Sequence, residues 1–387
     1  MSSVCLHNGT IFTGFSTIEN CAVLIEDGVV SDVFTQKRLA QKRFTNNTRI
    51  IDVNKAYITP GFIDTHIHGA GGFGTDDESA DALIEMSKFL IKYGVTAFNP
   101  TLYPSADMVS VIKALLPAIG KETGAKIMGF HLEGPFLSPK YLGVQKPEFL
   151  RSVDIPFMEE LWNAAQGHII NMTVAPELKN MHELALYCEK KGIVLQAGHT
   201  NASYENMVEG ILAGIFHTTH LFNAMSAMEH RNPNAAGAIL IHHETTCEVI
   251  ADGLHVHKAL FQFLLRDKSA ANIVLVTDSL KPTDMESPPY FANSEEVEFS
   301  GGLWRRKSDG VIAGSALTMI KGIENLVEFG FSLEDAVRAA STNPARIMRY
   351  LNKGALVPGG DADLTVFDKN WRILTVIAGG DIKFNIL

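Results

Sequence analysis

The sequence predicts an α/β protein: a (β/α)8 barrel with a small β-sandwich domain that both chain ends build together. Strand-like apolar runs alternate with helix-compatible stretches between residues 58 and 347, the order typical of parallel barrels. Residues 1–57 and 348–387 contain short strand-like segments and turn signals instead. The 387 residues, of which 46% are hydrophobic, are enough for one large barrel and an accessory domain.

The two terminal segments are expected to form strands. Residues 22–33 place Asp27-Gly28 between two β-rich segments, which is a strong hairpin signal, and residues 49–53 could be another strand. In the tail, residues 362–367 and 371–377 return to strand-like sequence. Neither segment is large enough to bury a core alone, so we expect both to pair into one domain.

Eight buried strands are predicted in the middle of the chain. Their apolar runs are continuous rather than alternating, as expected for parallel strands buried on both faces. An open doubly wound sheet is the alternative, but no glycine-rich dinucleotide loop follows the first run. The predicted strands are 58–68, 95–100, 126–133, 169–176, 193–199, 215–220, 246–252 and 272–278; helices are predicted at 79–93, 106–122, 178–191, 203–213, 315–329 and 333–340, and a hairpin at 295–312.

Composition excludes several classes of function. The formal net charge is −10, and an acidic surface repels phosphate backbones, so nucleic acid is not an expected partner. No apolar run is long enough to span a bilayer and no signal peptide is visible, so we expect a cytoplasmic protein without a membrane partner. The four cysteines are scattered, which favours reduced thiols over a disulfide framework.

Ionisable residues stand at the ends of the predicted strands. His66 and His68 end the first strand and, being two residues apart, point to the same side. The carboxyl ends of parallel barrel strands meet at one mouth, so these side chains should converge. Imidazole and carboxylate groups are suitable ligands for a divalent metal. The other candidates are Glu133, His199, His220 and Asp278, at the ends of the third, fifth, sixth and eighth strands; His131 lies one layer deeper and is expected in the core.

Residues 59–68, Thr-Pro-Gly-Phe-Ile-Asp-Thr-His-Ile-His, resemble the first-strand signature of the amidohydrolase superfamily. Later motifs resemble the family of N-acetylglucosamine-6-phosphate deacetylases, from residue 60 to residue 345 and again at 354–363. A cyclic-amide hydrolase of the dihydroorotase type would need a lysine on the fourth strand, and residues 170–177 contain none. The motifs are His-Leu-Glu-Gly-Pro-Phe at 131–136, Gly-His-Thr-Asn-Ala at 198–202, Thr-His-Leu-Phe-Asn-Ala-Met at 219–225, Ala-Asp-Gly-Leu-His at 251–255, Thr-Asp at 277–278 and Ala-Gly-Ser-Ala at 313–316.

The resemblance implies a metal-dependent hydrolase that removes the acetyl group of N-acetylglucosamine-6-phosphate in amino-sugar catabolism. Zinc is the expected metal, with iron, manganese or cobalt as alternatives, and one or two ions are expected in each subunit. Asp278 would move a proton from the attacking water to the leaving amine. His255 would donate a hydrogen bond to the carbonyl oxygen. Glu133, His199 and His220 would hold the first ion, and His66 and His68 would admit a second ion bridged through Glu133.

The resemblance also implies a set of substrate contacts. Asn223 and the backbone of Ala224 would contact the phosphate, and Arg231 would reach it from the neighbouring subunit of a homodimer. Ile312 and Ala313 would form a substrate-facing loop.

One position departs from the family pattern. The resembled enzymes usually carry Gly-x-His-x-Pro here, whereas residues 143–147 read Gly-Val-Gln-Lys-Pro and place Gln145 where the histidine would contact the substrate. Glutamine can still donate a hydrogen bond but cannot become cationic. Three alternatives therefore stay open: a deacetylase of N-acetylgalactosamine-6-phosphate or another N-acetyl sugar, a different amidohydrolase, and a sugar-binding protein without catalysis.

Overall fold

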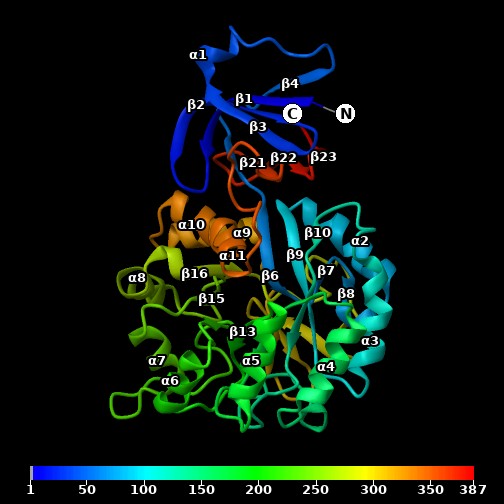
Figure 1. Cartoon of the computed structure of the whole chain (residues 1–387), viewed down its shortest axis with the longest axis vertical. Helices are drawn as coiled ribbons and strands as arrows, with labels where there is room; N and C mark the ends of the chain where they lie inside the picture. Colours follow the sequence, from blue (N-terminus) through cyan, green and yellow to red (C-terminus); the bar gives the residue numbers. More distant parts are fainter. Residues whose placement is uncertain (1–2) are drawn as a thin grey trace.

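Strands from both ends of the chain share one sheet in the computed structural model, which describes residues 3–387. The antiparallel pairing of β21 with β5 joins the C-terminal strands to the N-terminal ones, and the sheet caps the larger body (Figure 1). Its order is β23-β22-β21-β5-β1-β2-β3, with β4 beside β1. The strands are β1 (Ser3–Phe12), β2 (Thr17–Glu26), β3 (Val29–Thr35), β4 (Thr48–Asp52), β5 (Tyr57–Pro60), β21 (Leu364–Phe367), β22 (Ile373–Ala378) and β23 (Asp381–Asn385); the short helix α1 spans Gln36–Leu39.

The hairpin predicted at Asp27-Gly28 is confirmed. Both residues have positive φ, 53° and 83°, and they connect β2 to the antiparallel strand β3. Side chains from both chain ends then meet in one apolar cluster that includes Leu6, Val23 and Val366.

The strand predicted over residues 58–68 is two strands. β5 ends at Pro60 inside the terminal sheet, and β6 (Phe62–Ile67) begins after Gly61 and pairs with β9 (Val95–Leu102). A Cβ atom on Gly61 would lie 2.1 Å from the Oγ1 atom of Thr96, so only glycine lets the backbone pass so close to this side chain. An apolar run cannot reveal this change of sheet.

A curled parallel sheet forms the centre of the larger body. Every residue of β6 and β9 is buried, as expected for strands covered on both faces. Backbone hydrogen bonds from Leu221 N to Glu248 O (2.9 Å) and from Asp278 N to His66 O (2.9 Å) link the ends of neighbouring strands. The sheet contains β10 (Lys126–Ile127), β9, β11 (Phe130–Glu133), β12 (Ile169–Val174), β13 (Val194–Ala197), β14 (His217–Thr218) and β6; β15 (Cys247–Ile250) pairs separately with β16 (Ile273–Val276).

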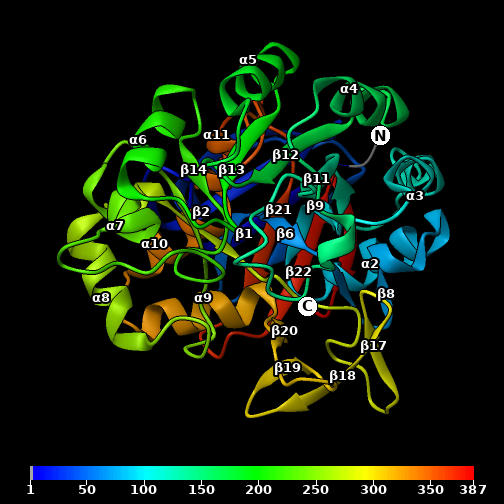
Figure 2. The ribbon, with the colours of Figure 1, turned by 90° about the horizontal axis from the view of Figure 1, so that it is seen from below.

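Helices lie outside this parallel sheet (Figure 2). Serine and aspartate side chains cap several of them: Ser203 accepts a hydrogen bond from Asn206 N and Asp154 from Phe157 N. No helix among the described residues is long and apolar enough to cross a membrane. The helices are α2 (Ala80–Ile91), α3 (Met108–Leu115), α4 (Ile155–Ala164), α5 (Met181–Lys191), α6 (Tyr204–Leu212), α7 (Asn234–Ile241), α8 (Lys258–Asp267), α9 (Met319–Glu328), α10 (Leu333–Ala340) and α11 (Thr342–Ile347), with 3-10 turns at Thr75–Asp77, Leu116–Ala118, Pro147–Phe149 and Ala270–Asn272.

A small antiparallel sheet projects beside the strand ends (Figure 2). It contains the hairpin predicted at residues 295–312, and its last strand turns back toward the parallel sheet through a bridge between Ser279 and Ser315. Trp304 is buried in this sheet and its Nε1 donates to Thr283 Oγ1 at 3.3 Å. The strands are β17 (Tyr290–Ala292), β18 (Glu295–Ser300), β19 (Leu303–Arg306) and β20 (Ile312–Gly314), and a separate hairpin pairs β7 (Gly69–Ala70) with β8 (Phe73–Gly74).

Candidate active site

The candidate metal ligands all stand at the carboxyl ends of parallel strands. His66 lies in β6, and His68 follows it directly. Glu133 is the last residue of β11, and Asp278 lies two residues past the end of β16. His199 and His220 each follow by two residues the ends of β13 and β14. Because these strands run parallel, one end of the sheet collects all six side chains.

Glu133 and two histidines form the first group of possible ligands. The Oε1 atom of Glu133 lies 3.0 Å from His199 Nε2 and 3.2 Å from His220 Nε2. The two imidazole nitrogens are themselves 3.2 Å apart. All three side chains are buried, so no solvent screens this convergence.

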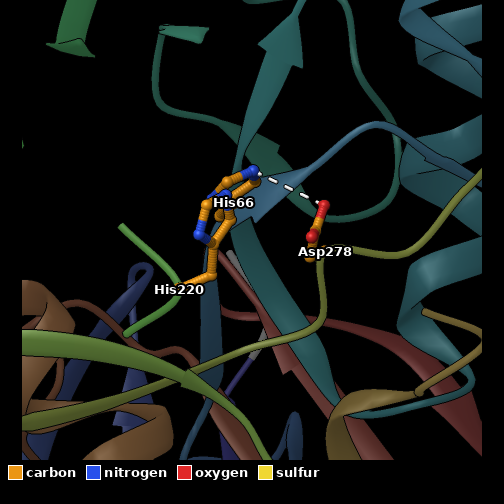
Figure 3. A group of neighbouring side chains, drawn as sticks. All are labelled: His66, His220 and Asp278. Atoms are coloured by element: carbon orange, nitrogen blue, oxygen red, sulfur yellow. Dashed lines mark ion pairs between the residues drawn. The ribbon is translucent and has the colours of Figure 1, made fainter. Parts of the chain in front are cut away.

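A second group surrounds His66 and His68. The His68 Nε2 atom lies 3.3 Å from Glu133 Oε2. The Oδ1 atom of Asp278 lies 3.5 Å from His66 Nε2 and 3.6 Å from His68 Nε2. Figure 3 shows His66 and Asp278 facing each other beside His220. The two groups therefore share the carboxylate of Glu133.

These distances also fit ligands of a divalent metal. Two ligand atoms bound to one tetrahedral zinc ion are about 3.3 Å apart, because each lies about 2.0–2.1 Å from the ion. The possible ligand atoms of Glu133, His199 and His220 all lie within 4.8 Å of one another. The buried Nε2 atom of His66 has no hydrogen-bond partner among residues 3–387. A cation would satisfy this nitrogen and the neighbouring ones together.

Electrostatics keep the shared carboxylate ionised. Burial alone would favour the neutral acid, but the charge of His199 and the close contacts of His199, His220 and His68 with the carboxylate hold the pKa of Glu133 well below its usual range. Burial opposes the charged form of His199, yet Glu133 raises its pKa. Glu133 is thus held as a carboxylate, the form that a metal ligand requires.

Hydrogen bonds at the Nδ1 atom orient three of the histidine rings. His199 Nδ1 lies 2.8 Å from the carbonyl oxygen of Tyr141, and His68 Nδ1 lies 3.2 Å from the carbonyl oxygen of Thr101. His66 Nδ1 lies 3.0 Å from the Oε2 atom of Glu248, a buried carboxylate on β15. These oxygens accept hydrogen bonds, so in the neutral rings Nδ1 carries the proton and Nε2 faces the cluster.

Sequence reasoning missed these three partners. Tyr141 and Thr101 act through backbone carbonyl oxygens, which leave no trace in the sequence. Glu248 did carry a signal, because it is a carboxylate inside a fully buried strand. Burial favours its neutral form, but the nearby ring of His217 and the hydrogen-bonded ring of His66 hold its pKa well below the usual range.

A cavity of about 370 Å³ opens above the ligand cluster. Its size suits a monosaccharide. Lys140 is the one lysine or arginine among its lining residues. The other lining residues include His68, Glu133, Gln145, His199, His220, Asn223, Ala224, His255, Asp278, Ile312 and Ala313, so the structure brings together most of the predicted site residues.

Arg231 is a predicted site residue that lies away from the cavity. It is exposed in the loop between β14 and α7 and does not line the cavity of its own chain.

His255 is held in place by a neighbouring carboxylate. Its Nδ1 atom lies 2.6 Å from Asp252 Oδ2, and Asp252 Oδ1 accepts the backbone N–H of His255 at 2.8 Å. Burial opposes the charged form of Asp252, but the hydrogen bonds from His255 and Leu254 lower its pKa. The ring is fixed with its Nε2 atom left for a ligand.

Gln145 makes a contact that was not predicted. Its side chain is buried, and Nε2 donates a hydrogen bond of 2.6 Å to Glu133 Oε2. The predicted partner was the substrate, whereas the partner in the structure is the shared carboxylate of the ligand cluster.

A parallel sheet with histidine and carboxylate ligands at its carboxyl end defines a class of metal-dependent hydrolases. Residues 57–387 match the Amidohydrolase family, so the chain belongs to that family. The resemblance found in the motifs is therefore confirmed.

The individual relatives reported below are deacetylases of phosphorylated amino sugars. The chain is 32% identical to the N-acetylglucosamine-6-phosphate deacetylase of Bacillus subtilis over 391 residues, covering 99% of this chain and 97% of the relative. It is 30% identical to the N-acetylgalactosamine-6-phosphate deacetylase of Escherichia coli O157:H7, covering 84% and 87%. A mutant N-acetyl-D-glucosamine-6-phosphate deacetylase from Mycobacterium smegmatis, solved in complex with N-acetyl-D-glucosamine-6-phosphate, superposes with a TM-score of 0.91 at 27% identity over 100% of both chains.

Proposed function

We propose that this chain hydrolyses the acetamide of N-acetylglucosamine-6-phosphate to glucosamine-6-phosphate and acetate. The observation that carries the proposal is the joining of the Glu133, His199 and His220 cluster with Asp278 in one cavity of monosaccharide size. Similarity to deacetylases of phosphorylated amino sugars over nearly the whole chain supports it.

Zinc is the metal we propose, with the first ion at Glu133, His199 and His220. His66 and His68 would take a second ion together with Asp278 and Glu133. A divalent ion at these positions supplies an activated water and polarises the carbonyl group of the substrate.

The protein's own groups handle the protons. Asp278 would accept a proton from the attacking water and pass it to the amide nitrogen, since an amine leaves as a neutral molecule and not as an anion. His255, oriented by Asp252, would donate its Nε2–H to the carbonyl oxygen as negative charge develops there. The added water thus divides between acetate and the free amine.

The phosphate group needs contacts of its own in the cavity. We propose that Asn223 and Ala224 contact it, that Arg231 reaches it from the partner in a homodimer, and that Ile312 and Ala313 cover the sugar. Both Asn223 and Ala224 line the cavity, and Ala224 has a positive φ of 48° that turns its backbone sharply there.

The remaining proposals concern architecture and location. We propose that the curled sheet is a closed (β/α)8 barrel that begins with β6 at Phe62 and ends near residue 347. The chain up to residue 60, which includes β5, and residues 348–387 would form the β-sandwich domain. Two hydrogen bonds support closure: one joins Leu221, three residues past β14, to Glu248 of β15, and the other joins Asp278, two residues past β16, to His66 of β6. We propose a cytoplasmic enzyme, in keeping with its four buried free cysteines.

A substrate panel tests the proposed function. Acetate release is measured with N-acetylglucosamine-6-phosphate, N-acetylgalactosamine-6-phosphate and unphosphorylated N-acetylglucosamine. We expect the highest kcat/KM for the first sugar, and Asp278→Asn should lower kcat by roughly 100- to 10,000-fold, because the amide cannot accept the proton.

The other outcomes decide between the alternatives. Preference for the galactosamine sugar would support the second candidate, which similarity to the Escherichia coli relative favours. Preference for the unphosphorylated sugar would remove the phosphate from the proposal. Metal binding without acetate release from any sugar would identify a binding protein.

A further inference from the structure

Gln145 directly contacts the carboxylate that the two metal positions share. It lies twelve residues after Glu133, in the loop that follows β11, and its side chain is 2% exposed. The distance from its Nε2 atom to Glu133 Oε2 is 2.6 Å, which indicates a strong charge-assisted hydrogen bond.

This contact divides the two oxygens of Glu133 between two sets of neighbours. Oε1 faces His199 and His220 and lies 3.5 Å from His66 Nε2, whereas Oε2 faces His68 and Gln145. The terminal torsion of a glutamate is broad, so the side chain alone does not fix the plane of its carboxylate. A donor held on one side fixes that plane and keeps Oε2 turned toward His68.

The loop that carries Gln145 is anchored on both sides. Ser138 N donates to His199 O at 2.8 Å, and Gln145 N donates to Leu142 O at 3.0 Å. Further along, Asn293 Nδ2 donates to the carbonyl oxygen of Val144 at 3.3 Å. The amide is therefore placed by the protein before any ligand arrives.

The oxygen atom of the same side-chain amide indicates that a ligand binds beside it. The Oε1 atom of Gln145 is buried and has no hydrogen-bond partner among residues 3–387. Leaving such an acceptor unsatisfied costs about 1–3 kcal/mol, so a side chain whose role was purely structural would be expected to have a protein donor at both ends. The cavity that Gln145 lines is where that donor would come from.

We infer that Gln145 is a positioning residue that sets the affinity of the second metal position, at His66 and His68. By holding Glu133 Oε2 toward His68, it makes the carboxylate a bridge instead of a ligand of the first ion alone. The inference rests on the metal centre of the proposed function but not on its substrate, so it is tested without any sugar.

The experiment is a titration of metal-free protein with Co²⁺, followed by calorimetry and by the visible absorption of the bound ion. We expect two binding events for the wild type. Gln145→Leu should leave the first dissociation constant within about twofold and weaken the second by roughly 10- to 100-fold, the usual effect of removing a partner of a metal ligand. Gln145→His keeps an N–H donor and should recover part of the loss.

Lys146→Ala is the matched control. Lys146 is the next residue of the same loop, but its ammonium group lies 3.9 Å from Glu295 and not against the cluster. Unchanged dissociation constants in this variant would support a specific effect of Gln145.

Three outcomes would each overturn the inference. They are equal affinities of Gln145→Leu and the wild type, equal losses of affinity in Gln145→Leu and Lys146→Ala, and binding of a single ion by the wild type. Acetate release by wild type that binds two ions separates this result from failure of the proposed function.

Discussion

His199, His220 and Asp278 share a backbone conformation that residues with side chains rarely adopt. Their φ angles are 46°, 26° and 47°, and each lies just past the end of a parallel strand. Such a conformation costs about 1–3 kcal/mol and persists only where the surrounding structure enforces it. The sharp turn after each strand directs the side chain into the cavity, so part of the folding energy is stored where the ligands converge.

This strain leads to a prediction about His199. Both His199→Ala and His199→Gly remove a ligand, and neither should retain the first metal ion. In metal-free protein, however, His199→Gly should be more stable than His199→Ala by about 1 kcal/mol, because glycine adopts a positive φ without steric cost. Urea denaturation of the two variants measures the difference. Equal stability would show that the backbone relaxes when the histidine is removed.

Much of this site could be predicted one residue at a time. A histidine or carboxylate at the end of a buried run is visible in the sequence, and the parallel topology then determines where these residues meet. The partners that orient them could not be predicted, because the carbonyl oxygen of Tyr141 belongs to the backbone. The contact between Gln145 and Glu133 was missed for a different reason: the course of the loop decides it, and the pattern of apolar residues does not.

At the level of elements, the sequence did not reveal where individual strands begin and end. The sixth predicted strand spans residues 215–220, whereas β14 contains His217 and Thr218 alone. The third predicted strand is divided into β10 and β11. A continuous apolar run shows that a segment is buried but not where its ladder hydrogen bonds begin and end. Helices α4, α7 and α8 were not singled out from the sequence either.

The junction at Gly61 provides a prediction at this scale. Gly61→Ala would place a methyl group within 2.1–2.7 Å of three side-chain atoms of Thr96. Overpacking of this kind costs about 1–3 kcal/mol, so the midpoint of urea unfolding should fall. Removing the obstructing side chain by Thr96→Gly should make Gly61→Ala much less harmful. A double-mutant cycle measures this coupling, and additive effects would contradict the steric explanation.

At the scale of the whole molecule, the charges of a single chain do not by themselves explain how the cavity would bind an anionic sugar. The chain carries a net charge of −10, and Arg231 lies outside the cavity of its own subunit. Lys140 is the one lysine or arginine that lines the cavity. A homodimer in which each chain lends Arg231 to its partner would supply the missing positive charge for an anionic sugar.

Subunit mixing tests this arrangement. Asp278→Asn lacks the carboxylate that we propose transfers the proton, and Arg231→Ala should raise KM for the phosphorylated sugar but not for the unphosphorylated one. In a mixed dimer, the Arg231→Ala chain keeps an intact catalytic group and receives Arg231 from its Asp278→Asn partner. Mixing two weakly active proteins should therefore restore acetate release at low substrate concentration. Strictly averaged activity after subunit exchange would contradict a shared site.

The terminal sheet cannot form completely until strand β21 has been synthesised, long after strand β5. Strand β5 ends at Pro60, and its antiparallel partner β21 begins at Leu364, about 300 residues later. At roughly 5–20 residues per second, a ribosome takes ~15–60 s to make the intervening chain. Throughout that time one edge of β5 has no partner, and an open strand edge invites pairing with other chains. The nascent protein therefore exposes an unpaired strand edge, beside the strand that carries His66, until residues 364–367 have been synthesised.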